Sequence, residues 1–110
     1  MRPISLLLPA LLAGAGLGAA AQASDKLFEQ ATESDAELKA LYHEAGGLCL
    51  RNRSHDVRVV VACKSMVIYG LALNERGWCH GRRSEPNAVK DWHRCGPGSD
   101  RFSRDLLTRF

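Results

Sequence analysis

Four cysteines, Cys49, Cys63, Cys79 and Cys95, constrain the fold of this chain more than any other feature of its sequence. An even number of cysteines in a short exported chain is typical of a disulfide framework, here of two bonds. The chain has 110 residues, of which 45% are hydrophobic and 25% charged, and this fits one folded domain. The same composition excludes collagen-like, coiled-coil and multi-span membrane proteins.

Residues 1–23 have the pattern of a cleavable signal peptide. Arg2 precedes an uncharged run over residues 4–21, and Ala21-Gln22-Ala23 forms a small-x-small cleavage pattern. A retained anchor is the alternative, but three glycines dilute the run. We therefore expect a periplasmic or secreted protein with no stable membrane span after cleavage and one domain over residues 24–110. Removing 23 of the 110 residues leaves 87, so two disulfides worth about 2–4 kcal/mol each would matter for its stability.

The pairing of the four cysteines is not decided by the sequence, because three connectivities are possible. We favour Cys49–Cys63 with Cys79–Cys95, since the loops that these bonds close, of 13 and 15 intervening residues, are short and local. In the alternative, Cys95 reaches back to the central segment of the chain.

The first part of the domain has a helical pattern. Over residues 27–45, hydrophobic residues recur at steps of three and four. Ser34 and Glu37 have the spacing of a capping box, so we expect a break near residues 32–34 between a short helix and a longer one. Gly46-Gly47 is expected to end the longer helix, because glycine readily adopts the left-handed conformation there.

A buried central helix is favoured over residues 57–73. The segment is rich in β-branched residues, which suit strands, but 17 residues with few polar members are long for one strand. Ser54 is a candidate N-cap, and Asp56 suits the first turn. The alternative is a hairpin that turns at Lys64-Ser65, where the usual turn glycine or asparagine is missing.

A third helix is expected from Ser84 to Arg94, capped by Ser84 and stopped by Gly96-Pro97. In the tail, Phe102, Leu106 and Phe110 have the spacing of one helical face. The sequence thus predicts a mostly α, small disulfide-stabilised helical domain after a cleaved signal peptide. An α+β fold with a hairpin at 57–73 is the alternative.

Two blocks near the second pair of cysteines are rich in aromatic residues. Residues 69–81 read Tyr-Gly-Leu-Ala-Leu-Asn-Glu-Arg-Gly-Trp-Cys-His-Gly, and residues 92–95 read Trp-His-Arg-Cys. Over roughly residues 63–95 the chain resembles uncharacterised small exported four-cysteine proteins of Gram-negative bacteria that carry Tyr-Gly-x-x-Leu-Asn-x-Arg-Gly-Trp-Cys-x-Gly and Trp-His-x-Cys. No function is attached to that group, so the resemblance implies export and disulfide bonds and no activity.

Three motifs could carry chemistry. Cys79, His80, His93 and Cys95 are donor types for tetrahedral zinc, although they lack the closely spaced ligand pairs of a zinc finger. Cys79-His80 combines a thiol with a base, but sequence neighbours seldom point the same way. His55-Asp56 is similar to the pair used by calcium-dependent secretory phospholipases, without the cysteine that precedes that pair.

We therefore expect no catalytic residue, metal or cofactor. The alternative is a small secreted hydrolase or metal-dependent enzyme that uses His80 and His93 or the His55-Asp56 pair.

Charge is divided unevenly along the chain. Residues 24–50 carry six acidic and two basic residues, and residues 51–110 carry six acidic and twelve basic ones. Bases and aromatic rings near the second pair of cysteines form a candidate binding surface: Arg76, Trp78, His80, Arg82, Arg83, Trp92, His93 and Arg94. Tryptophans that pack over the disulfides and a solvated basic face are the plainer interpretation.

The partner that this surface would suit is an anionic envelope component or a protein. Nucleic acid is not expected, because the bases and stacking rings make too weak a cluster. The sequence as a whole predicts an exported, non-enzymatic binding, inhibitor or accessory protein of unknown ligand.

Overall fold

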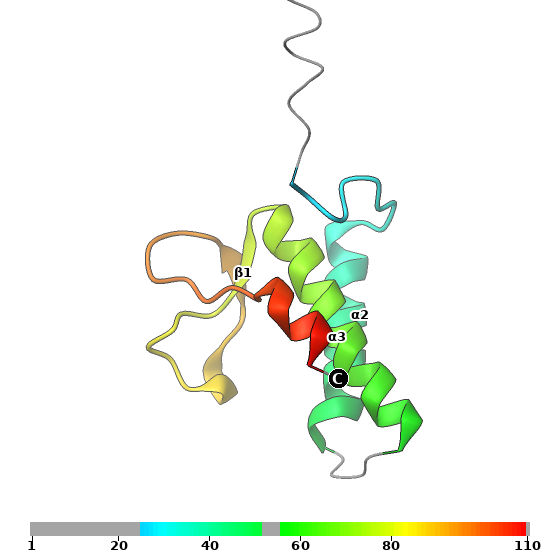
Figure 1. The fold of residues 1–110 in the computed structure, drawn as a ribbon. Coiled ribbons are helices and arrows are strands. Elements are labelled where there is room, and N and C mark those ends of the chain that lie inside the picture. The colour runs from blue at the N-terminus through cyan, green and yellow to red at the C-terminus, as the bar shows by residue number, and fades with distance from the viewer. Residues whose placement is uncertain (1–24, 52–55, 110) are drawn as a thin grey trace, which may run out of the picture.

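Two long helices lie side by side and antiparallel, and a small two-stranded hairpin packs beside them (Figure 1). The computed structural model describes residues 25–51 and 56–109, so the predicted signal peptide lies outside it. Its elements in chain order are α2 (Asp35–Arg51), α3 (Val57–Glu75), β1 (Trp78–His80), the 3₁₀ turn η2 (Asn87–Val89), β2 (Trp92–Arg94) and the 3₁₀ helix η3 (Arg104–Thr108). The predicted small, mostly helical domain is confirmed, with a hairpin added.

Helix α2 begins as the sequence predicts and ends later. Ser34 Oγ accepts a hydrogen bond from the Glu37 N–H, and Glu37 Oε1 accepts one from the Ser34 N–H, both at 3.0 Å. The short helix expected before this capping box is wrong, because residues 25–34 form turns and irregular backbone. The expected end at Gly46-Gly47 is also wrong. Gly46 is buried beside Met66 of α3, and this packing offsets the low helix propensity of glycine.

The central helix predicted over residues 57–73 is confirmed, and the alternative hairpin there is wrong. Asp56 is the N-cap of α3 and accepts hydrogen bonds from the N–H groups of Arg58 and Val59. The predicted cap, Ser54, lies outside the described residues. Leu38 of α2 and Ala72 and Leu73 of α3 form the centre of the core.

The third helix expected from Ser84 to Arg94 is wrong. Only the single turn η2 forms there, and β2 pairs antiparallel with β1, with Trp78 opposite Arg94 and His80 opposite Trp92. The capping and stop signals are local, and the pairing of β2 with β1 and the Cys79–Cys95 bond offset them. Of the predicted tail face, Phe102 precedes η3, Leu106 lies in it, and Phe110 is outside the described residues.

The favoured cysteine pairing is confirmed. Cys49–Cys63 joins the end of α2 to the first turns of α3, with 4.8 Å between the Cα atoms. Cys79–Cys95 ties β1 to the end of β2, with 5.0 Å between the Cα atoms. Cys79 is fully buried, so the second bond also belongs to the core.

Asn74 attaches both the hairpin and the C-terminal segment to the last turn of α3. Its amide nitrogen donates to the Trp78 carbonyl at 2.8 Å, and its Oδ1 accepts from the Phe102 N–H at 2.7 Å. One side chain therefore satisfies backbone groups from two segments that lie 24 residues apart in the sequence.

We expect the two disulfides to contribute unequally. Replacing Cys49 and Cys63 by alanine should lower the free energy of unfolding by about 3 kcal/mol, from loop entropy alone. The same change at Cys79 and Cys95 should cost more, because the buried Cys79 side chain also leaves a cavity. Urea unfolding of both double variants measures this; a larger loss from the first pair would contradict it.

We expect Asn74→Ala to lower the free energy of unfolding by about 2 kcal/mol, since it leaves two half-buried backbone groups without their partners. Asn87→Ala, on the exposed 3₁₀ turn, is the control and should have little effect. Equal losses in the two variants would show that the amide of Asn74 does not hold these segments.

Candidate functional site

Two residues of the predicted binding surface, Arg76 and Trp78, are held within the fold by Asp35, and a third, Arg94, lies over the Trp78 ring. Arg76 Nη1 donates to Asp35 Oδ1 at 2.8 Å, and Trp78 Nε1 donates to Asp35 Oδ2 at 2.9 Å. The Arg94 guanidinium carbon lies 4.2 Å from the centre of the Trp78 ring, and Lys39 Nζ lies 3.3 Å from it. Hydrogen bonds from Arg76 and Trp78 lower the pKa of the Asp35 carboxyl. This cluster joins the acidic start of α2 to the basic hairpin.

His80 and Trp92 face each other across the two strands and belong to a second group of aromatic rings. Their ring centres lie 4.8 Å apart, and Tyr42 of α2 contacts both, at 5.1 Å and 4.9 Å. Phe102 lies 5.8 Å from Tyr42. The two tryptophans pack against the core cluster of the helices.

The remaining predicted residues differ in their surroundings. His93 Nε2 lies 3.0 Å from the Gly81 carbonyl oxygen and 3.5 Å from Ser99 Oγ. Arg82 and Arg83 are exposed. Of the eight predicted residues, His80 lines the pocket described next.

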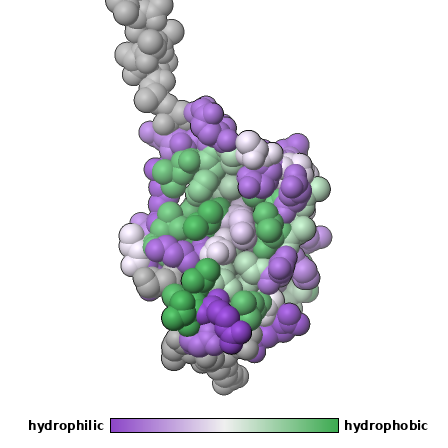
Figure 2. All heavy atoms as spheres, turned by 90° about the vertical axis from the view of Figure 1, so that its right-hand side faces the viewer, coloured by the Kyte–Doolittle hydropathy of each residue, from purple (hydrophilic) through white to green (hydrophobic). Residues whose placement is uncertain are grey.

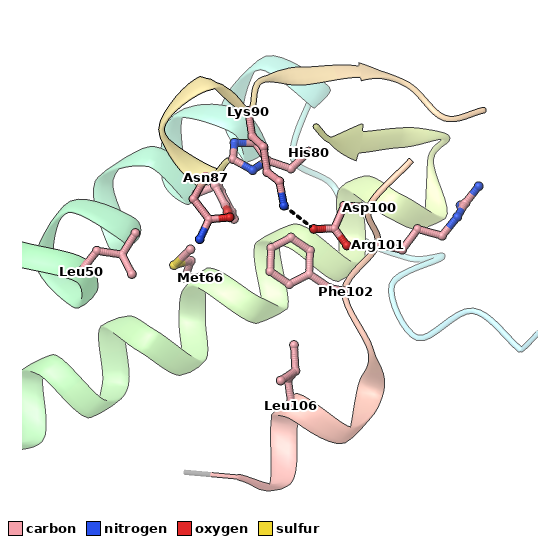
Figure 3. Close-up of a pocket in the computed structure, with 10 residues that line it drawn as sticks. Leu50, Met66, His80, Asn87, Lys90, Asp100, Arg101, Phe102 and Leu106 are labelled. Atoms are coloured by element: carbon pink, nitrogen blue, oxygen red, sulfur yellow. Dashed lines mark hydrogen bonds and ion pairs between the residues drawn. The ribbon is translucent and has the colours of Figure 1, made fainter. Parts of the chain in front are cut away.

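A pocket of about 370 Å³ lies between the helix pair, the hairpin loop and the C-terminal segment (Figure 3). Its polar and apolar sides are distinct. The polar residues are His80, Asn87, Lys90, Asp100 and Arg101, and the apolar ones are Leu50, Met66, Phe102 and Leu106, with Tyr42 also in the wall.

The polar side is organised by an ion pair between Lys90 and Asp100. Their Nζ and Oδ2 atoms are 2.6 Å apart, and the Lys90 side chain is only 10% exposed. Gly81 makes this possible, because its φ is +72° and a Cβ there would lie 2.1 Å from Lys90 Cγ. The hydrogen bond from Lys90 is the main cause of the lowered pKa of Asp100, and the charge of Arg83 contributes.

The apolar side is closed by Phe102. A Cβ on Gly70 would lie 2.5 Å from the Phe102 ring, so the ring rests directly on the backbone of α3. Met66 and Leu106 flank it from α3 and η3 (Figure 3). The pocket thus offers an aromatic and aliphatic surface on one side and charged groups on the other.

Burial governs the two titratable rings in the wall. It lowers the pKa of His80, against the opposing effect of Asp91, and it raises the pKa of Tyr42 to about 12. Both rings are therefore neutral at pH 7, and the charges at the pocket are those of Lys90, Asp100 and Arg101.

The catalytic and metal interpretations meet specific obstacles in this geometry. The disulfide occupies both Cys79 and Cys95, which removes the thiol and the zinc thiolates. His80 and His93 occupy adjacent pairs of the sheet, so their side chains point to opposite faces. No three His, Cys, Asp or Glu side chains of residues 25–51 and 56–109 gather to hold a metal. His55 lies outside this range, and Asp56 is engaged as a helix cap.

Of the ten residues that line the pocket, the sequence placed only His80 in the binding surface and missed the other nine, among them Lys90, Asp100 and Phe102. They come from separate segments and have no motif spacing. The approach of Gly81 to Lys90 arises only in the folded structure, and no sequence pattern connects the two residues.

Comparisons with protein-family models, with curated proteins and with solved structures found no match for this chain.

We expect Asp35→Asn to lower the melting temperature at pH 7, because it removes the charge that Arg76 and Trp78 stabilise. The folded-state pKa of Asp35 is lowered, so its contribution is present above the unfolded pKa of about 4 and is lost as pH falls through the folded value. Thermal unfolding from pH 7 to pH 2.5 should therefore show the difference between variant and wild type shrinking. Glu33→Gln, on an exposed carboxylate nearby, is the control; a difference independent of pH would contradict the argument.

Proposed function

We propose that this protein is an exported, non-enzymatic binding protein that holds a small anionic amphiphile in the pocket of Figure 3. The proposal depends on one observation: the wall of that pocket is apolar on one side and charged on the other. Ligand sites are typically concave and mainly apolar, with a few convergent polar groups and volumes of about 300–1,000 Å³. The volume of about 370 Å³ suits a small molecule.

Export to the periplasm or beyond is supported by the two disulfides. They are compatible with an oxidising compartment, and all cysteines of the chain take part in them. The signal-peptide pattern of residues 1–23 agrees with the same location.

The charge at the polar side favours an anionic head group. Lys90 and Arg101 line the pocket, and Arg83 is close enough to act on the Asp100 carboxyl. A carboxylate or sulfonate would share the Lys90 ammonium with Asp100, while its apolar part would contact Phe102. Among the anionic envelope components that could be the partner, we therefore propose a small amphiphile.

We test this with the fluorescent amphiphile 1-anilinonaphthalene-8-sulfonate. Leu106→Trp should weaken binding of the probe at least about tenfold, because the larger side chain fills the apolar side of the pocket. Leu107→Trp is the matched control, since Leu107 is equally half-buried in η3 and does not line the pocket. Fluorescence titration gives both dissociation constants, and equal affinities would contradict the proposal.

Lys90→Met tests the charge preference. The variant should lose affinity for the sulfonate probe by about tenfold or more, and it should retain affinity for the uncharged N-phenyl-1-naphthylamine. An equal loss of affinity for both probes would contradict the proposed preference, because it would mean that the pocket has collapsed or does not distinguish charged from uncharged ligands.

A further inference from the structure

Aliphatic side chains are exposed where α2 ends and α3 begins. Val57 is 76% exposed, Leu50 72% and Val61 57%, and Leu48 and Val60 are exposed to a lesser degree. We call these five residues the hairpin tip, meaning the end of the helical hairpin formed by α2 and α3, which is distinct from the β1–β2 hairpin. In Figure 2, hydrophobic atoms reach the surface at this lower end of the molecule, next to hydrophilic ones. Aliphatic side chains that are exposed together at one end of a domain are a mark of an interaction site.

A disulfide and a helix cap lie beside the hairpin tip. The Cys49–Cys63 disulfide ties α2 to α3 next to these residues, and Asp56 caps the first turn of α3. The exposed residues therefore belong to a cross-linked pair of helices, the second of which is capped.

Basic residues surround the hairpin tip. Arg51, Arg58 and Lys64 are exposed, and Arg51 Nε donates to the Gly47 carbonyl at the end of α2. These residues form a basic rim around the hairpin tip. Asp56 pairs with Arg58 at 3.1 Å, and Arg51 and Lys64 give the rim a net positive charge. Aliphatic residues within a basic rim suit the interface of an anionic bilayer.

Helix α3 does not need to cross the bilayer for this contact. It is long and apolar enough to span a membrane, with a mean hydropathy of 1.5, but core helices of other folds pass the same test. Its residues from Val67 to Leu73 are largely buried against the rest of the domain. Only its first turns, which carry Val57, Val60 and Val61, are exposed aliphatic surface.

A second copy of the chain is a poorer occupant. Joining two hairpin tips would bring Arg51 and Lys64 of one copy close to the same residues of the other, and like charges oppose such contact. We propose that the hairpin tip inserts shallowly into the surface of an anionic lipid bilayer. This inference is independent of the proposed pocket ligand, although Leu50 belongs to both sites.

The experiment places a tryptophan at the hairpin tip of the oxidised full chain. Val57→Trp is mixed with vesicles of phosphatidylcholine and phosphatidylglycerol at 3:1 whose acyl chains carry bromine, a quencher that acts only at close range. Val89→Trp is the matched control, because Val89 is also an exposed valine, at 60%, and lies on η2. Subtracting the wild-type signal removes the contribution of Trp78 and Trp92.

We expect quenching of Val57→Trp and little quenching of Val89→Trp. Quenching of Val57→Trp should fall at least fivefold on vesicles of phosphatidylcholine alone, because these carry no anionic lipid for the basic rim. It should fall as much in 0.5 M salt, because salt screens the attraction between the rim and the anionic lipid. Adding Val61→Glu to Val57→Trp should abolish it. Absence of quenching, or equal quenching at both positions, would overturn the proposal.

Self-association is the competing outcome. Sedimentation equilibrium that shows a dimer which Val57→Glu dissolves, without quenching on vesicles, would assign the hairpin tip to a second copy and overturn the lipid proposal. Binding of 1-anilinonaphthalene-8-sulfonate by Val57→Glu is measured in parallel; retained affinity keeps the pocket and the hairpin tip distinguishable.

Discussion

The attachment of a very short hairpin to the end of α3 is the constraint on which the rest of this structure depends. Strands of three residues each are too short to be stable by themselves. The hairpin persists because Cys79 is buried and bonded to Cys95, and because Asn74 holds both Trp78 and Phe102. Without this attachment, the loop between the strands would have no fixed position over the helices.

The pocket follows from that attachment. Lys90 comes from the hairpin loop and Asp100 from the segment after it, while Phe102 rests on α3 at Gly70. The two walls of the pocket are thus parts of one folded unit. The hairpin tip lies at the other end of the helix pair and is held by its own disulfide, so each disulfide supports a separate candidate function (Figure 1).

The sequence predicted the features that depend on neighbouring residues. The Ser34–Glu37 capping box, the central helix and the local cysteine pairing are confirmed. The expected helix from Ser84 to Arg94 failed because its signals are local, whereas β2 is fixed by pairing with β1. The predicted binding surface mixed residues with different environments, because Arg76 and Trp78 contact Asp35, 41 and 43 residues earlier in the chain.

What the sequence by itself determined is a small cross-linked domain with a buried central helix and a basic second half. Cysteine count, hydrophobic periodicity and charge are properties of the chain before it folds. Only the tertiary structure decided that Lys90, Asp100 and Phe102 share a pocket and that Leu50 and Val57 share an exposed tip. Both juxtapositions arise from the packing of separate segments. In the pocket, the positive φ of Gly81, the absence of a side chain at Gly70 and the side chain of Asn74 allow these segments to approach.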